Sequence, residues 1–170
     1  MLPEAGAEYA VRAAKILEKE DIKVVMHAND QELPKIKKLI DELRPANFQL
    51  ITEFLSDIDL RNLMQKCHLS LGQLSGHPRL QRTIPHKAYE SLALRLPYLT
   101  ADNKGVMELL KPGENCLVCR PADPQSLAEQ ILWAKAHPYE LEQIAENGYR
   151  LYQEKLTAKT LAGELLKVIF

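Results

Sequence analysis

The sequence predicts an α/β fold, a three-layer sandwich in which helices cover both faces of a parallel sheet of about five strands. Helical and strand-like patterns alternate along the chain, as crossover units between parallel strands require. The strand-like runs are short and almost wholly apolar, which is typical of strands buried on both faces. The chain has 170 residues, of which 46% are hydrophobic. This size predicts a single domain over residues 1–170 with a substantial core.

In the first half of the chain, helical stripes and strands alternate. The first helical stripe consists of Ala10, Ala13, Ala14 and Leu17. The second consists of Leu33, Ile36, Ile40 and Leu43. Pro45 follows this second stripe and ends it. Apolar runs predict strands over residues 23–28 and 48–54, and Asp57 can cap the helix that follows.

The second half continues the alternation and ends in three helices. Strand patterns cover residues 69–74, 97–101 and 116–119. Helical patterns cover residues 85–94, 106–110, 124–136, 139–151 and 157–168. Residues 74–84 form the longest irregular stretch and are the expected functional loop. Ligands of such folds bind beyond the carboxyl ends of the strands, where this loop lies.

Charge and composition exclude several classes of protein. The formal net charge of −1 argues against a general nucleic-acid binder, which would be strongly basic. No apolar run approaches the roughly 18 residues of a membrane span. The N-terminus lacks the basic and apolar regions of a signal peptide. The three cysteines cannot all pair, so a reducing cytoplasm is the expected compartment.

The most informative stretch runs over residues 83–97, where a loop turns into a short helix and then a strand. Pro85 suits the first helical turn, because its missing N–H is not needed there. The free backbone N–H groups of that turn can bind an anion such as a phosphate. Glu90 lies about a turn and a half further on. Its carboxylate can accept hydrogen bonds from two adjacent hydroxyls, as on a ribose, so the stretch suits a nucleotide.

Four stretches together carry a family resemblance. Residues 2–6 and 11–17 form a Leu-Pro-Glu loop followed by a helix, and residues 83–97 form the loop and helix described above. Residues 108–118 read E-L-L-K-P-G-E-N-C-L-V, and residues 121–128 read P-A-D-P-Q-S-L-A. In this order and spacing, they resemble the C-terminal, nucleotide-sugar-binding domain of group 1 glycosyltransferases, which have two Rossmann-like domains (the B-type fold).

The resemblance implies a Rossmann-like donor domain of a retaining glycosyltransferase of the hexosyltransferase type. The donor would be a UDP-, GDP- or ADP-sugar, without a further cofactor or a metal, and its sugar would pass to an acceptor hydroxyl. Glu90 matches a family glutamate that is associated with the ribose hydroxyls. The backbone N–H groups of His86 and Lys87 would bind the diphosphate. Asn29 and Asp30 lie where the family contacts the base, and no residue is assigned as catalytic.

Arg82 marks one departure from the family pattern. The family has a pair of glutamates separated by seven residues, and the first would fall at Arg82. A guanidinium fork matches phosphate oxygens, so Arg82 can instead bind donor phosphate together with Arg79 and Lys87. The alternative is a solvent-exposed loop arginine. This substitution leaves the identity of the sugar open.

A second departure lies at the N-terminus. In the family a strand precedes the Leu-Pro-Glu loop and follows a complete acceptor-binding domain, and neither has a counterpart in this sequence. We therefore expect the C-terminal half of a longer enzyme that is inactive by itself. The acceptor would bind through the missing N-terminal domain, which leaves a peripheral position at the inner membrane open. Exposed strand edges invite pairing, so a homodimer is a further expectation.

Three features have more than one interpretation. Glu90 has a structural alternative, in which it pairs with Lys87 at i,i+3 spacing or is simply solvated. The whole chain has a functional alternative, a non-catalytic nucleotide- or protein-interaction module that retains the fold; a nucleotide-sugar epimerase fits the 83–97 stretch less well. Cys116 and Cys119 have a metal-like spacing, but neighbouring positions on a strand point to opposite faces, and core packing is the preferred interpretation.

Overall fold

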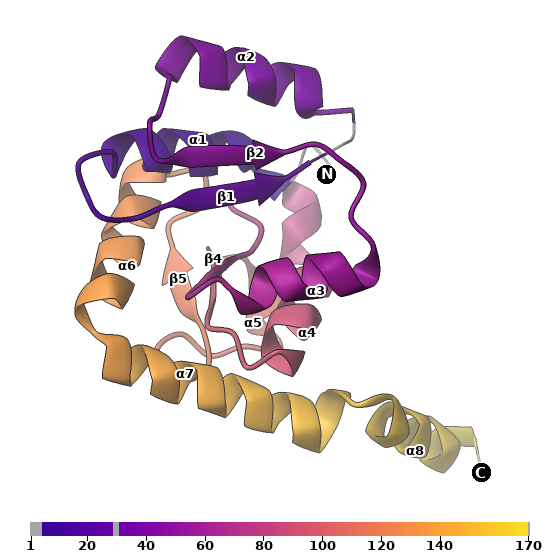
Figure 1. Ribbon diagram of the computed structural model, residues 1–170. Coiled ribbons are helices and arrows are strands. Elements are labelled where there is room, and N and C mark those ends of the chain that lie inside the picture. Colours follow the sequence, from indigo (N-terminus) through magenta and orange to yellow (C-terminus); the bar gives the residue numbers. More distant parts are fainter. Residues whose placement is uncertain (1–4, 29–30, 170) are drawn as a thin grey trace.

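The computed structural model describes residues 5–28 and 31–169 and shows helices packed around short strands (Figure 1). The strands are β1 (Val24–His27), β2 (Phe48–Ile51), β3 (Ser70–Leu71), β4 (Tyr98–Ala101) and β5 (Leu117–Cys119). Every predicted strand is present, although β2 ends at Ile51 and β3 has only two residues. All strand pairs in the described residues are parallel, which confirms the predicted α/β class.

The strands are distributed over two sheets rather than one. In the first sheet, β1 pairs with β2. In the second, β4 lies between β3 and β5. No ladder joins β1 to β3 within the ranges that the structure describes. All four residues of β4, the central strand of the second sheet, are buried, whereas β1 and β3 are mainly half-buried.

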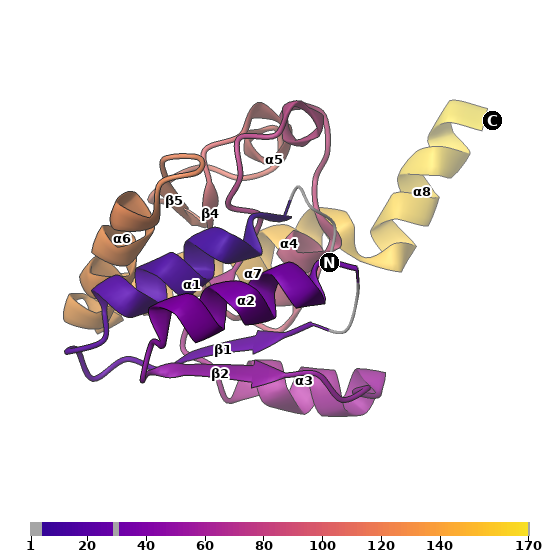
Figure 2. The ribbon, with the colours of Figure 1, turned by 90° about the horizontal axis from the view of Figure 1, so that it is seen from above.

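The predicted helices are all present. They are α1 (Ala7–Ile16), α2 (Leu33–Leu43), α3 (Asp57–Gln65), α4 (His86–Ala93), α5 (Lys104–Met107), α6 (Pro124–Ala136), α7 (Pro138–Leu151) and α8 (Ala158–Ile169). Two short segments are additional. A 3₁₀ helix, η2 (Pro78–Gln81), lies within the predicted loop, and a π-helical segment, η3 (Tyr152–Leu156), joins α7 to α8. Figure 2 shows α8 projecting from the rest of the chain.

Five helix starts differ from the prediction, and those of α7 (Pro138) and α8 (Ala158) differ by one residue. Ser56, not Asp57, caps α3, because its Oγ accepts a hydrogen bond from the Asp59 N–H at 3.2 Å. Asp57 occupies the first turn instead, where a negative charge is favourable. Pro85 is the N-cap of α4 rather than part of its first turn, and its backbone is extended (φ −73°, ψ 146°). The helix predicted over 106–110 both begins and ends earlier, at Lys104 and Met107.

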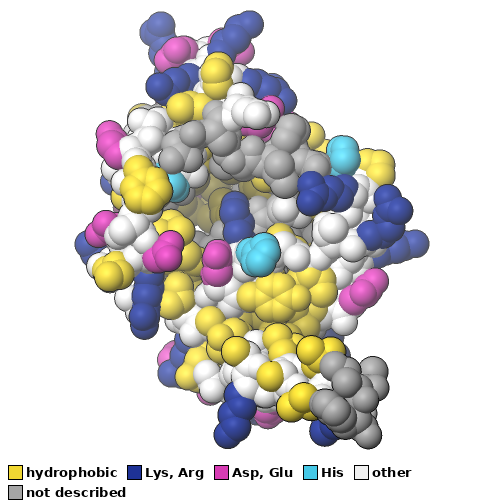
Figure 3. Space-filling model, turned by 90° about the vertical axis from the view of Figure 1, so that its right-hand side faces the viewer, with side chains coloured by type: hydrophobic (Ala, Val, Ile, Leu, Met, Phe, Trp, Pro, Cys, Tyr) yellow, Lys and Arg dark blue, Asp and Glu magenta, His cyan; other side chains and the backbone are white. Residues whose placement is uncertain are grey.

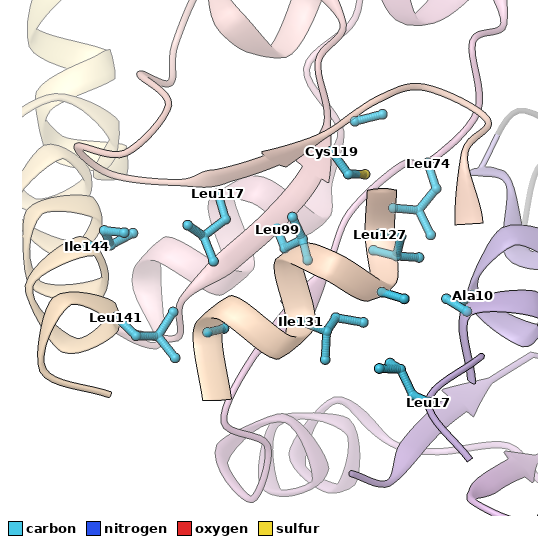
Figure 4. Close-up of a cluster of buried hydrophobic side chains, with 14 residues drawn as sticks. Ala10, Leu17, Leu74, Leu99, Leu117, Cys119, Leu127, Ile131, Leu141 and Ile144 are labelled. Atoms are coloured by element: carbon cyan, nitrogen blue, oxygen red, sulfur yellow. The ribbon is translucent and has the colours of Figure 1, made fainter. Parts of the chain in front are cut away.

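Helix α1 joins the two halves of the fold through its small side chains. One face belongs to the main hydrophobic core and contributes Ala10, Ala13 and Leu17. Figure 4 shows Ala10 and Leu17 beside Leu127 and Ile131 of α6. The opposite face places Ala7 and Val11 against Ile36 and Leu39 of α2. Alanines allow the helix axes to approach closely, so α1 packs between α2 and α6.

A second cluster holds α4 against β4 and the C-terminal helices. Ala88 and Leu92 of α4 pack with Tyr98, and Leu151 of α7 covers the same cluster. Ser91 is fully buried, and its Oγ lies 2.7 Å from the Lys87 carbonyl oxygen and 2.8 Å from the Ser70 Oγ. This contact ties α4 to β3. The orientation of α4 relative to the strands is thus determined by both apolar packing and a buried hydroxyl pair.

Gly72, directly after β3, allows the backbone to pass close to Tyr98. A Cβ at this position would lie 2.3 Å from the Tyr98 hydroxyl oxygen and 2.7 Å from the Thr100 Oγ1. We therefore predict that Gly72→Ala destabilises the fold by about 1–3 kcal/mol through overpacking. Thermal unfolding should show a melting temperature lower by roughly 3–10 °C.

Gly163→Ala is the matched control for this substitution. Gly163 lies in α8, and a Cβ there would have no neighbour within 4 Å. Since alanine is the better helix former, this variant should melt at the same temperature as the wild type or slightly above it. Equal melting temperatures for Gly72→Ala and the wild type would contradict the close approach.

Candidate functional site

The predicted site residues that the structure describes lie near the carboxyl ends of the strands. The chain leaves β3 at Leu71, passes through η2 and reaches α4, while the Ala101 N–H at the end of β4 donates to the Gln73 carbonyl at 3.0 Å. Figure 3 looks at the end of the molecule toward which β1 and β2 point in Figure 1. It shows a hollow that holds a Lys or Arg side chain, with a His and an acidic side chain beside it.

Helix α4 divides into a buried and an exposed face. Ala88, Ser91 and Leu92 are buried. The exposed residues include His86, Lys87 and Glu90. Positions three and four apart share one face of a helix, so these three predicted residues form a single outward surface. The structure therefore brings together three of the predicted ligand-binding side chains.

The first turn of α4 keeps free hydrogen-bond donors. The cap residue, Pro85, has no side-chain acceptor for these N–H groups. The Ala88 N–H bonds to the Pro85 carbonyl at 3.0 Å, whereas His86 and Lys87 have no acceptor for their N–H groups among the described residues. Such N–H groups, at the positive end of a helix, form a site for an anion.

Lys87 and Glu90 differ in their electrostatic surroundings. Protein atoms crowd the Lys87 ammonium group, and this desolvation lowers its pKa, while the nearby Glu90 carboxylate opposes the shift. The residue nevertheless remains exposed on the outward face of α4. Within the described part of the chain no ion pair joins the two side chains, so the alternative of a Lys87–Glu90 pair is not seen. A bound phosphate would compensate for the desolvation of Lys87.

Arg82 is exposed in the loop before α4. It follows η2, and its N–H donates to the Arg79 carbonyl at 3.1 Å. Within the described residues its side chain makes no hydrogen bond or ion pair with α4. Asn29 and Asp30, the predicted contacts of the base, lie outside the described residues. The neighbouring His27 is described, and its Nε2 lies 3.0 Å from the Glu53 carbonyl oxygen.

A buried amide network holds the loop that leads into α4. Asn103 is 2% exposed, and its Nδ2 donates to the Ser75 carbonyl at 3.1 Å. Its Oδ1 accepts a hydrogen bond from the Gln81 Nε2 at 2.9 Å, and the Gln81 Oε1 accepts one from the Lys104 N–H at 3.3 Å. Sequence reasoning missed Asn103 and Gln81. The available signal was a pair of polar residues, Asp102 and Asn103, after a buried strand.

Gly105 lets the same loop approach α5. A Cβ at Gly105 would lie 2.6 Å from the Leu80 carbonyl oxygen and 2.6 Å from both the N and the O of Thr83. Only a residue without a side chain fits here. The backbone of residues 80–83 is thus held between α5 and the start of α4, which sets the position of the N–H groups of α4.

Comparison with known sequences identifies the family. Residues 1–151 match the sequence profile of the family described as glycosyl transferases group 1. The chain belongs to the group 1 glycosyltransferases. This confirms the resemblance predicted from the four sequence stretches. A curated relative, the alpha-D-kanosaminyltransferase of Streptomyces kanamyceticus, is 26% identical over 169 residues, which are 98% of this chain and 42% of that protein.

Solved glycosyltransferase structures share the fold. HepE from Anabaena, solved in complex with UDP, aligns with a TM-score of 0.83 at 20% identity, over 99% of this chain and 46% of that one. The C-terminal domain of the group 1 protein LpcC from Francisella tularensis aligns with a TM-score of 0.78 at 17% identity, over 93% of this chain and 83% of that one. The chain spans less than half the length of HepE and of the kanosaminyltransferase.

Other features of this glycosyltransferase domain agree with a structural role for the cysteines. Burial raises the pKa of Cys116 to about 12 and that of Cys119 to about 11, so both thiols stay protonated.

In the described residues no group of three His, Cys, Asp or Glu side chains could hold a metal ion. No helix there is long and apolar enough to cross a membrane.

The amide network predicts how the site loop responds to substitution. Gln81→Ala would leave the Asn103 Oδ1 without its side-chain donor and the Lys104 N–H without its acceptor, a loss of about 1–2 kcal/mol. The amides of residues 76–84 should then exchange hydrogen roughly 5- to 30-fold faster, because the loop opens more often. Amides of α6 and α7 should be unchanged.

Gln125→Ala controls for the loss of an exposed glutamine amide. Gln125 also makes a side-chain hydrogen bond, to the Glu129 Oε1 at 3.2 Å, but it lies on the surface of α6. This variant should leave exchange in residues 76–84 at the wild-type rate. Unchanged exchange in the Gln81→Ala loop would show that the network does not hold it.

Proposed function

We propose that this chain is the donor-binding domain of a glycosyltransferase that holds a nucleoside diphosphate sugar at the N-terminus of α4. One observation carries the proposal. In a member of this family, the uncapped N–H groups of α4 and the exposed side chains of Lys87 and Glu90 share one surface near the strand ends. HepE, which has the same fold, was solved with UDP and with UDP-glucose, and this supports a uridine nucleotide as the first donor to test.

The groups on α4 match the parts of such a donor. The diphosphate would accept hydrogen bonds from the His86 and Lys87 N–H groups and lie close to the Lys87 ammonium. Glu90 would accept hydrogen bonds from the ribose hydroxyls. Arg82 would move toward the phosphates from its exposed position in the loop. Asn29 and Asp30 remain the proposed contacts of the base.

The proposed reaction transfers the sugar to an acceptor hydroxyl. The bond between the anomeric carbon and the diphosphate oxygen breaks, and a bond forms between that carbon and the acceptor oxygen, whose proton passes to solvent. Negative charge grows on the departing diphosphate. Preorganised N–H groups and a nearby cation stabilise such charge, so we propose that the reaction needs no metal ion and no cofactor. The acceptor would bind through a second domain.

Glu90 provides the most direct test of the donor site. We expect UDP to bind saturably in calorimetric titration. The titration is carried out with this chain and with a longer polypeptide that contains it. Glu90→Ala should weaken binding by roughly 10- to 100-fold, because hydrogen bonds to a charged group contribute about 1.5–3 kcal/mol. Glu142→Ala, an exposed glutamate of α7, is the control and should bind like the wild type. Absence of saturable binding of UDP, GDP and ADP alike would refute the proposal.

The pKa of Lys87 predicts a pH dependence. The charged ammonium attracts the diphosphate, and its pKa lies below the usual value of about 10.4 for lysine. UDP affinity should therefore fall as the pH rises from about 7 toward 10, through the lowered pKa. Lys87→Arg should keep its charge over this range and lose that part of the dependence. The wild type and Lys87→Arg bind the same UDP, so a change in the protonation of UDP with pH affects both affinities equally. Identical pH profiles would exclude Lys87 from the phosphate site.

A further inference from the structure

A separate cavity of about 490 Å³ lies where α6 and α7 meet beside β5. Its volume is in the range of small-molecule sites. Apolar residues of β5 and α7, such as Leu117, Val118 and Ile144, line part of the cavity. The lining also includes two aromatic and four polar side chains, those of Trp133, Tyr139, Gln130, Glu140, Gln143 and Asn147. The proposed function uses none of these residues.

The cavity lies away from the α4 surface. Helix α6 begins at Pro124, just after the carboxyl end of β5, and runs back along the strands. The cavity is lined by its second half and by the first half of α7, so it lies toward the opposite end of the strands. In Figure 1, α6 and the start of α7 are on the left, whereas β1 and β2 point to the right. A ligand in this cavity would not occupy the donor site.

Trp133 lines the cavity, and a neighbouring ring holds it in a defined orientation. The rings of Trp133 and His137 are stacked, with centroids 4.5 Å apart and an interplanar angle of 13°. The His137 Nδ1 lies 2.8 Å from the Trp133 carbonyl oxygen, which fixes the position of the histidine. Tyr139 contributes a second ring, which is 71% exposed. Exposed aromatic rings with a polar edge are favoured where a ligand is partly apolar and partly wet.

The polar side chains around these rings are available for hydrogen bonding. Gln130, Glu140 and Gln143 make no hydrogen bond or ion pair with the described part of the chain. The Asn147 Nδ2 donates to the Glu114 carbonyl at 2.9 Å, so its Oδ1 is left as an acceptor. The amides can donate to and accept from a hydroxyl group, and the carboxylate can accept from one. The lining contains no lysine or arginine, which disfavours phosphates and other anions.

We propose that this cavity binds a neutral glycan, with a sugar ring against the aromatic wall and its hydroxyls on Gln130, Glu140 and Gln143. Sugar rings expose C–H groups on their faces and hydroxyls at their edges, which fits apolar walls with planar polar groups between them. This second glycan site would hold part of a saccharide chain away from the reacting centre. The inference rests on the cavity alone and stands even where the donor proposal fails.

Trp133 makes the test specific, because it is the only tryptophan in the chain. Maltohexaose, cellohexaose and chitohexaose are titrated separately while tryptophan emission is recorded. At least one should change the emission saturably, with a dissociation constant on the order of 1 mM. Tyr139→Ala and Gln143→Ala should each weaken this binding by about five- to tenfold. Tyr139 and Gln143 are exposed, so both variants should fold, and circular dichroism checks this.

Two controls distinguish glycan binding in the cavity from binding elsewhere on the chain. Glu142→Ala lies on the same helix but outside the lining and should bind the glycan like the wild type. Glucose 6-phosphate should bind no better than glucose, because no cation faces the cavity. The proposal is overturned if no glycan changes the Trp133 emission. It is equally overturned if both cavity variants keep wild-type affinity, or if the phosphorylated sugar binds more tightly.

Discussion

The packing of α1 between α2 and α6 is the interaction on which the rest of the fold depends. Because the strands form two separate sheets, no strand ladder joins β1–β2 to β3–β4–β5 in the described residues. One backbone hydrogen bond, from the Leu74 N–H to the Ala5 carbonyl at 2.8 Å, links the segment before α1 to the segment after β3, and the apolar contacts of α1 add to this link. Ala10 and Ala13 face the main core while Ala7 and Val11 face α2, and small residues on both faces allow close packing on both sides. A bulky residue at any of these alanines would separate the two halves.

Hydrogen bonds and close backbone packing connect the candidate site to this arrangement and determine its geometry. Ser91 ties α4 to β3, and Asn103 ties the loop after β3 to the end of β4. Gly105 lets residues 80–83 lie directly on α5. Buried polar contacts, rather than the loop itself, thus hold the exposed N–H groups and side chains of α4 in position. A site that must bind an anion without rearrangement benefits from such support, since ordering the loop on binding would cost free energy.

Periodicity and turn chemistry were sufficient to predict the order of helices and strands, and residues 124–136 match α6 at both ends. The same signals placed His86, Lys87 and Glu90 on one short helix. Strand pairing could not be predicted, because division into two sheets depends on contacts between distant segments. The 3₁₀ helix η2 was not predicted, because its four residues are too few to show a periodic pattern of apolar side chains. The Asn103–Gln81 pair links positions 22 residues apart and leaves no local pattern.

The proposed donor site would reconcile a net charge of −1 with a dianionic ligand. Local donors, rather than overall charge, would meet the diphosphate at the helix start. Glu90 lies four residues beyond His86, a rise of about 6 Å along the axis, so its carboxylate would be displaced from the phosphates toward the position of a ribose. Lys87 lies between His86 and Glu90 in the sequence, and its charge would offset the repulsion between carboxylate and phosphates. A carboxylate one turn earlier would compete with the ligand for the N–H groups, so the spacing of Glu90 from Pro85 is itself a requirement of the site.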